Sequence, residues 1–230
     1  MFRFFYNNFI PYSIKLKFNW MTMLQMQKEE KEYQKRFPSP VLTDIHLRNL
    51  KIISDRDAML NLLPKNGIIA ELGVDEGLFS KEIISKCKPQ KLHLIDAWDS
   101  MQYTIEKMET TKQNLKMELK DNNIVFHKGF SFVELEKFED HYFDWVYIDT
   151  DHSYETTKKE LNSCLKKVKT DGLITGHDYV TRCYNNFTRY GVVEAVNEFC
   201  VEHNWEFLYL THENNRHISY TIRKIRDNNQ

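Results

Sequence analysis

Residues 67–77 read Gly67-Ile-Ile-Ala-Glu-Leu-Gly73-Val-Asp-Glu-Gly77, and this stretch decides the fold. The apolar run that ends at Gly73 predicts a buried strand, and the pattern over residues 78–87 predicts a helix with one apolar side. The chain has only 7 Gly in 230 residues, about half of the average usage of ~7%. Each Gly is therefore expected where only Gly fits. A strand, a glycine-bearing turn and a helix form the beginning of a parallel α/β unit.

The same alternation continues along the chain. Further strands are predicted at 91–96, 124–127, 143–149 and 173–176, with helices between them at 101–120 and 153–169 and another at 191–203. Two apolar segments, 206–210 and 218–222, flank a polar turn and predict a hairpin. We therefore predict an α/β fold: a Rossmann-like, doubly wound, mostly parallel seven-stranded sheet with a C-terminal antiparallel β-hairpin.

Composition excludes several classes of protein. Hydrophobic residues make up 41% of the chain, which argues against disorder over most of its length. The formal net charge of -1 argues against a nucleic-acid partner. No stretch approaches the ~20 apolar residues of a membrane span. The 4 Cys are scattered without a paired motif, which favours a reducing compartment, and we expect a cytoplasmic protein.

Residues 1–40 differ from the rest and are predicted to form an N-terminal arm. They are rich in aromatic residues, carry no acidic residue before Glu29, and end near Pro38 and Pro40. Three interpretations stay open: a poorly ordered segment, a lid or partner-packed segment that would support a homo-oligomer, and a transit or membrane-surface segment. Residues 41–230 contain all the predicted strands and form the second domain.

Carboxylates and glycines gather at the ends of the predicted parallel strands. In open α/β sheets, ligands bind beyond the carboxyl ends of the strands. The five strand ends carry Glu71 with Gly73, Asp96, Gly129, Asp149, and His177 with Asp178. Four of these five ends present a carboxylate, so the sequence predicts a polar small-molecule site at this edge.

The motif Glu71-Leu-Gly73-Val-Asp-Glu-Gly77, followed by Asp96, resembles the S-adenosylmethionine (SAM) site of class I SAM-dependent methyltransferases. The segments 147–154 (YIDTDHSY) and 176–179 (GHDY) are similar to those of the small-molecule, macrolide-sugar type O-methyltransferases. The resemblance implies that residues 41–230 form a methyltransferase domain. Its expected reaction is methyl transfer from SAM to an oxygen of a small-molecule acceptor, with a sugar as one candidate. One departure is Asp75, where many members have Gly and where a side chain narrows the approach to the cofactor.

The resemblance also assigns residues to the cofactor. Gly73 and Gly77 would let the backbone approach the methionine part of SAM, and Asp96 would accept hydrogen bonds from the ribose hydroxyls. Trp98 and the segment 129–131 would border the adenine. The full expected set is Glu71, Gly73, Gly77, Asp96, Trp98, Gly129, Ser131 and Asp149.

The expected catalytic residues are Asp149, His152 and His177. Asp149 and Asp178 follow neighbouring strands and could hold a divalent cation; their oxygen ligands favour Mg²⁺, Mn²⁺ or Ca²⁺. The cation would orient the acceptor hydroxyl and lower its pKa, and His152 or His177 would accept the proton. Two alternatives stay open: Asp149 binds only the ammonium group of SAM, or His152 fixes the loop or contacts substrate.

Other residues receive less specific interpretations. The segment 179–190 lies after the fifth strand and is interpreted as the acceptor-binding loop. Among the remaining histidines, His93 is interpreted as packed on a strand. Five others are interpreted as surface or turn residues: His46, His141, His203, His212 and His217.

Other functions are also considered for this sequence. The chain could be a differently reactive protein of this fold, like relatives described as hydroxylases, or a non-catalytic binding protein. A nicotinamide-dependent dehydrogenase is disfavoured, because the loop lacks the GxGxxG spacing that a dinucleotide needs.

Overall fold

The computed structural model describes residues 11–37, 40–99, 104–118, 123–183, 187–213 and 217–226. The chain divides into two compact units, Met1–Ser39 and Pro40–Gln230. The described part of the first unit contains one helix, α2 (Tyr12–Arg36), and none of its residues is buried. In the described ranges, no helix combines the length and the hydrophobicity needed to cross a membrane. The roles considered for the N-terminal arm stay predictions.

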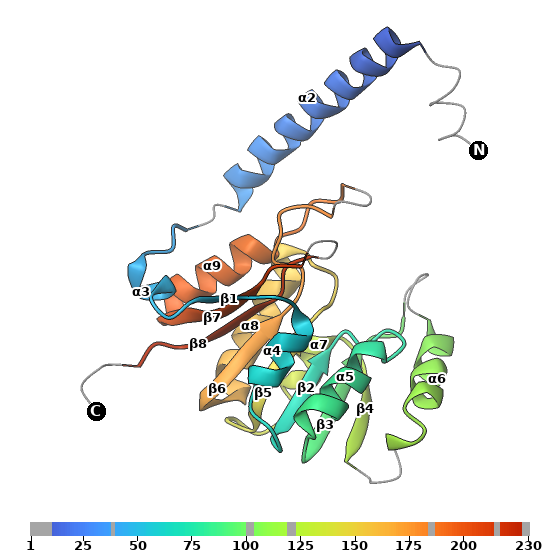
Figure 1. The fold of residues 1–230 in the computed structure, drawn as a ribbon, viewed down its shortest axis with the longest axis vertical. Helices are drawn as coiled ribbons and strands as arrows, with labels where there is room; N and C mark the ends of the chain where they lie inside the picture. Colours follow the sequence, from blue (N-terminus) through green and yellow to red (C-terminus); the bar gives the residue numbers. More distant parts are fainter. Residues whose placement is uncertain are drawn as a thin grey trace. The chain divides into compact units, whose positions relative to one another are not determined.

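The second unit alternates strands and helices along the chain (Figure 1). Its strands are β1 (Lys51–Ile53), β2 (Ile68–Leu72), β3 (Lys91–Asp96), β4 (Ile124–Lys128), β5 (Phe143–Ile148), β6 (Val168–Gly176), β7 (Trp205–Thr211) and β8 (Tyr220–Lys224). Its helices are α3 (Asp44–Leu47), α4 (Arg56–Leu62), α5 (Leu78–Cys87), α6 (Ile105–Asn114), α7 (Ser131–Leu135), α8 (Tyr154–Lys167) and α9 (Val192–His203). Residues 101–103 and 119–120 of the predicted helix 101–120 lie outside the described ranges.

The strands form one sheet in the order β1-β7-β8-β6-β5-β2-β3-β4. Only β8 runs antiparallel to its neighbours, β6 and β7, which confirms the mostly parallel sheet and the terminal hairpin. The predicted count of seven strands is wrong, because Lys51–Ile53 adds an eighth strand that pairs with β7 in parallel. Three residues are too few to produce a recognisable periodicity, so this edge strand depends on its partner.

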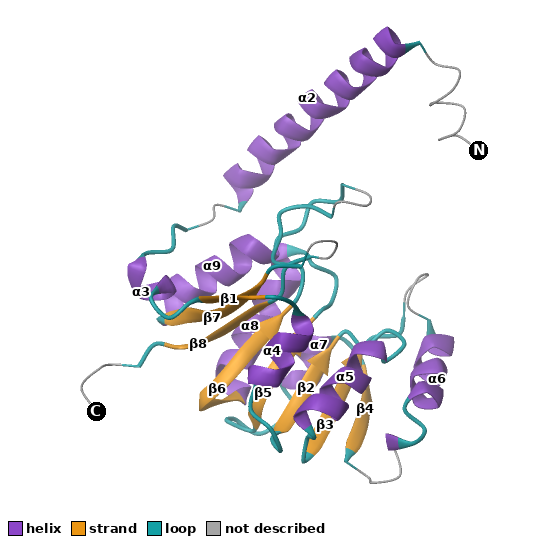
Figure 2. Cartoon of the chain, viewed as in Figure 1, coloured by secondary structure: helices purple, strands orange, loops and turns teal. Residues whose placement is uncertain are grey.

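Helices cover both faces of the sheet (Figure 2). On β2, Ile69 faces a core that includes residues of α4 and α5, whereas Ala70 and Leu72 face a core built with α7, α8 and α9. Both sides of the central strands are therefore buried. This explains why residues 143–148 form an almost continuous apolar run, as expected for a parallel strand covered on both faces.

Strand register brings the predicted strand-end residues to one edge. Leu72 of β2 is level with Ile95 of β3 and with Ile148 of β5. Ile148 is in turn level with Gly176 of β6. Since these strands are parallel, the residues that follow them emerge side by side at the carboxyl edge of the sheet.

Candidate functional site

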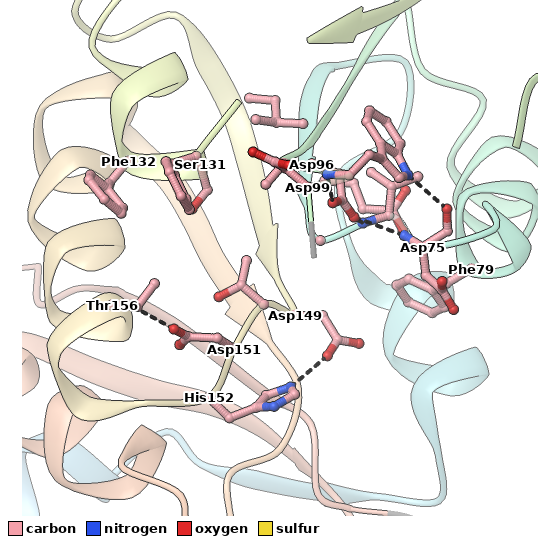
Figure 3. Close-up of a pocket in the computed structure, with 18 of the residues that line it drawn as sticks. Asp75, Phe79, Asp96, Asp99, Ser131, Phe132, Asp149, Asp151, His152 and Thr156 are labelled. Carbon is pink, nitrogen blue, oxygen red and sulfur yellow. Dashed lines mark hydrogen bonds and ion pairs between the residues drawn. The ribbon is translucent and has the colours of Figure 1, made fainter. Parts of the chain in front are cut away.

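A cavity of about 560 Å³ opens at this edge. Figure 3 shows its walls: Asp75, Phe79 and Asp96 lie on one side, and Ser131, Phe132 and Thr156 lie on the other. Six of the eight residues predicted to bind the cofactor line it: Glu71, Gly73, Asp96, Trp98, Ser131 and Asp149. Gly77 and Gly129 are not among the lining residues. The volume is within the usual range for small-molecule pockets.

The glycines of the loop 73–77, and Gly129, are required first by close contacts within the protein. Gly73 has φ +83°, and a Cβ at this position would lie 1.8 Å from the carbonyl oxygen of Asp149. Gly77 has φ +74° and precedes α5, and its Cβ would lie 2.6 Å from a methyl group of Thr111. At Gly129 a Cβ would meet the Glu134 carboxylate. Close approach of a ligand to Gly77 or Gly129 stays a prediction.

Asp96 holds the loop in place through its side chain. One carboxylate oxygen accepts hydrogen bonds from the backbone N–H groups of Val74 (2.7 Å) and Asp75 (3.0 Å). The other oxygen accepts from the N–H of Trp98 at 2.9 Å. Because a carboxylate offers about four lone-pair positions, Asp96 retains capacity for a ligand hydroxyl. Its expected contact with ribose stays a prediction.

Asp75 occupies the middle of the loop with φ +51°. This left-handed conformation is one that Gly adopts freely and that Asp tolerates better than most residues. Its carboxylate forms an ion pair with Lys107 of α6, and its carbonyl oxygen accepts from the indole N–H of Trp98 at 3.1 Å. Asp75, in place of the expected Gly, therefore adds a side chain to the cavity wall. Its ion pair with Lys107 attaches this side chain to α6.

Glu71 is a buried acid at the end of β2. Burial raises the pKa of Glu71 to about 8, and the nearby carboxylates of Asp149 and Asp96 act in the same direction, against a hydrogen bond that Ser80 donates to Glu71 at 2.5 Å. The side chain is thus largely neutral at pH 7 and can donate a hydrogen bond into the cavity.

Asp149, His152 and Asp178 form a second cluster at the ends of β5 and β6. Nε2 of His152 lies 3.2 Å from Oδ1 of Asp149 and 2.7 Å from Oδ2 of Asp178. Burial by itself lowers the pKa of His152, but hydrogen bonds with the two carboxylates outweigh it and raise this pKa to about 10. Burial raises the pKa of Asp149, yet hydrogen bonds from His152 and His177 hold it below its ordinary value.

The donor set of this cluster suits a divalent cation. One ligand atom from each of Asp149, His152 and Asp178 lies within 4.8 Å of the others. The two carboxylates are the predicted metal pair, and His152 is a third candidate ligand that was not assigned to a cation from the sequence. In the arrangement described here His152 is protonated at neutral pH, and a protonated imidazole neither binds a cation nor accepts a proton.

Two further histidines surround the aspartates. Nδ1 of His177 lies 3.4 Å from Asp178 and 3.6 Å from Asp149, and its Nε2 is buried without a hydrogen-bond partner among the described residues. His217 contacts the Asp178 carboxylate through Nδ1, and its side chain is only 11% exposed. His217 does lie in the connection between β7 and β8, as a turn residue would, but its side chain is largely buried. The interpretation of His46 as a surface or turn residue is wrong, because His46 is buried in α3.

Sequence reasoning missed His217 because its partner is 39 residues away along the chain. It also missed Arg56, whose Nη1 lies 3.9 Å from Asp149. Tyr190, at the end of the predicted acceptor loop, stacks on the His152 ring at 4.6 Å between centroids. The aromatic pattern of residues 179–190 was the one available signal for Tyr190; residues 184–186 of that loop lie outside the described ranges.

Comparison with known proteins agrees with this fold. Residues 70–179, just under half of the chain, match a protein family described as a methyltransferase domain. The matched range contains most residues of the cavity and of the aspartate–histidine cluster. No curated protein sequence matches the chain.

Several solved structures share the fold. An O-methyltransferase from Bacillus cereus in complex with SAH has 14% identity and a TM-score of 0.55, with 96% of each chain covered. A SAM-dependent methyltransferase from Aquifex aeolicus has 12% identity and a TM-score of 0.55, with 74% of this chain and 89% of that chain covered. At these identities the likeness shows a common fold.

Some of the matched structures are much longer than this chain. The pyocyanin biosynthetic protein PhzM has 12% identity and a TM-score of 0.55, with 73% of this chain covered, and the chain spans 53% of its length. The chain spans 43% of a methyltransferase from Galdieria sulphuraria.

Proposed function

We propose that the chain transfers a methyl group from SAM to an oxygen of a small-molecule acceptor, with a divalent cation held by Asp149 and Asp178. The observation that carries this proposal is the single cavity wall in which Glu71, Asp96 and Asp149 stand together with the glycine loop. SAM combines a carboxylate, an ammonium group, a sulfonium and two ribose hydroxyls, and this wall offers charges and hydrogen-bond partners for them.

The cofactor would lie along the carboxyl ends of β2 and β3. The first turn of α5 would face the methionine carboxylate, because backbone N–H groups and the helix dipole favour an anion there. Asp149 would attract the ammonium group or the sulfonium, and Asp96 would accept from a ribose hydroxyl. Neutral Glu71 would add a hydrogen bond without adding a second negative charge beside Asp149.

Methyl transfer is an in-line displacement at carbon: the acceptor oxygen forms the new bond, the sulfur–carbon bond breaks, and the hydroxyl proton leaves. A bound cation would supply Lewis acidity that lowers the pKa of the acceptor hydroxyl. Asp149 and Asp178 are the residues that would hold it, and His152 would join them only after it loses its proton. The described parts of the predicted acceptor loop, residues 179–183 and 187–190, would cover the acceptor and exclude water, with Tyr190 stacked on His152.

His152 and His177 are the two candidate proton acceptors. His152 lines the cavity, but its bonds to both carboxylates keep it protonated in the present arrangement. His177 lies behind it, against the same two carboxylates. The acceptor, the oxygen specificity and the cation remain part of the proposal.

Calorimetry tests the proposal without knowledge of the acceptor. SAM and its demethylated product S-adenosylhomocysteine (SAH) are titrated into the full chain, first with EDTA and then with Mg²⁺. We expect both ligands to bind, and Mg²⁺ to bind with a stoichiometry of one. Failure of SAM and SAH to bind under both conditions would contradict methyl transfer. Binding of both ligands without any Mg²⁺ binding would contradict only the metal-assisted form.

A further inference from the structure

Glu160 of α8 is a buried acid that the proposed function does not use. It does not line the cavity, but two residues that do line it donate hydrogen bonds to its carboxylate. The Ser131 hydroxyl donates to one oxygen, and the Thr150 hydroxyl donates to the other at 3.0 Å. One hidden carboxylate therefore holds two hydroxyl groups of the cavity wall.

The hydrogen bonds to Glu160 fix the direction in which these hydroxyls can act. A hydroxyl has one proton to donate and two lone pairs that accept. Since an ionised carboxylate only accepts, Ser131 and Thr150 must both point their protons at Glu160. Where either hydroxyl meets the cavity it then presents lone pairs alone, so it accepts hydrogen bonds there and does not donate them.

The surroundings of Ser131 suit a flat base. Phe130 and Phe132 flank it in sequence, line the same cavity, and have rings 6.0 Å apart in a stacked arrangement. Aromatic side chains with a few oriented polar groups are the usual lining for such a ligand. On the proposed function the adenine of SAM is the group that matches this wall, and its 6-amino group is a hydrogen-bond donor.

We infer that Glu160 is a positioning residue that makes the cavity select a 6-amino purine over a 6-oxo purine. This inference rests on the proposed function and deepens it. A 6-oxo group is an acceptor, so it would face the lone pairs of Ser131 or Thr150 with no proton between them. Discrimination of this kind is large, because the mismatched polar groups stay buried without partners.

The substitution Glu160→Gln changes the direction of one hydroxyl while it keeps the shape of the side chain. The amide of Gln has one accepting oxygen and one donating NH₂ group. One of the two hydroxyls must then accept from the NH₂, and its own proton becomes available to the cavity. That proton can pair with a 6-oxo group.

The test compares the affinities of SAH and S-inosylhomocysteine, which differ at position 6 of the purine, by calorimetry on the full chain. Burial raises the pKa of Glu160 to about 7, so the titrations are run at pH 8.5, where the carboxylate is ionised. We expect the unsubstituted protein to bind SAH at least about tenfold more tightly. In Glu160→Gln this ratio should fall by about tenfold, chiefly through tighter binding of the 6-oxo ligand.

Glu136→Gln is the matched control. Glu136 also accepts a hydrogen bond from a serine of α8, Ser163, at 2.8 Å, but it lies outside the cavity lining. The SAH to S-inosylhomocysteine ratio should stay unchanged in this variant. If Glu160→Gln does not fold by circular dichroism, Ser131→Ala replaces it, and its ratio should fall because it removes one accepting hydroxyl.

The outcomes distinguish a failure of the role inferred for Glu160 from a failure of the proposed function. If SAH binds but the ratio is the same in the unsubstituted protein and in the folded variant, the role of Glu160 is wrong and the proposed function stands. If SAH does not bind the unsubstituted protein, the proposed function fails and the inference fails with it.

Discussion

The two ends of the cavity are built in different ways. At the glycine-loop end, the Asp96 carboxylate accepts three backbone N–H groups from residues 74, 75 and 98. At the aspartate–histidine end, side chains hold other side chains: Asp149 and Asp178 are bridged by His152 and contacted by His177. The loop end is thus fixed by backbone geometry, and the other end is fixed by charge.

This difference has consequences for function. Backbone N–H groups do not titrate, so the hydrogen-bond donors that hold the loop end keep their protons over a wide range of pH. The aspartate–histidine end changes its charge when a proton or a cation binds, as a site for proton transfer requires. We therefore expect cofactor binding to depend on the loop end and cation binding to depend on the other end.

The largest expected effect is a crossover between two substitutions. Asp96→Asn turns an amide NH₂ toward backbone N–H groups and loses hydrogen bonds to a charged acceptor, each of which contributes about 1.5–3 kcal/mol. SAH affinity should fall about 100-fold, with Mg²⁺ affinity unchanged. Asp178→Asn should abolish Mg²⁺ binding and change SAH affinity by less than about threefold. Calorimetry measures all four values.

Asp171→Asn is the control for this pair, since Asp171 is exposed and lies outside the cavity lining. Both affinities should match those of the unsubstituted protein. If Asp96→Asn and Asp178→Asn each lost SAH binding and Mg²⁺ binding equally, the two ends of the cavity would not act separately. That result would contradict the assignment of cofactor binding to one end and of cation binding to the other.

An intermediate effect is expected from Glu71, the one strongly perturbed acid on the loop side. Its pKa is about 8 in the folded chain and near the ordinary 4.5 when unfolded, so the native state holds a proton that the unfolded state releases. The stability from this group is fully present below pH 4.5 and is lost as the pH rises through 8. Relative to Glu71→Gln, the unfolding free energy should fall between pH 5 and 8, by at most about 1.4 kcal/mol per pH unit.

Chemical denaturation at several pH values gives these free energies. Glu82→Gln on α5 serves as the control, because Glu82 is half-exposed and should show no such divergence from the unsubstituted protein. Parallel stability curves for the unsubstituted protein and Glu71→Gln would mean that Glu71 is ionised in the folded chain.

The smallest expected effect comes from Asp75→Gly. A positive φ costs a non-glycine residue about 1–2 kcal/mol, and the ion pair with Lys107 is half-exposed and contributes little. The variant should bind SAH a few-fold more tightly, because removal of the Asp75 side chain gives the cavity more room. Asp75→Asn, which keeps a side chain of the same size, should bind SAH as the unsubstituted protein does; weaker binding in Asp75→Gly would assign the side chain a role in holding the cofactor.

Much of the sheet was predictable from local pattern. Residues 68–72, 91–96 and 143–148 are apolar runs that end in turn or acidic residues, and each forms a strand close to its predicted bounds. The start of β6 was not predicted, because residues 168–172 are largely polar. In this stretch the register pairs Val168 with Phe143 of β5, and regular pairing resumes only at Leu173.

The site was predictable in part for the same reason. Residues that directly follow a parallel strand must emerge at one edge, so Glu71, Asp96 and Asp149 could be brought together from sequence alone. Arg56, Glu160 and His217 could not. Arg56 lies at the N-terminus of α4, Glu160 in the interior of α8, and His217 in the connection between β7 and β8. The positions of these side chains depend on how those elements pack.

The order of amino acids by itself determined an alternating α/β chain, the edge at which its acids collect, and the glycines that its tightest turn requires, because periodicity and backbone sterics act over a few residues. Tertiary structure alone decided which of the ionisable side chains carry a proton. That choice depends on burial and on distances of a few ångströms between groups far apart along the chain, and it makes Glu71 neutral, His152 charged and Glu160 a hidden acceptor behind the cavity wall.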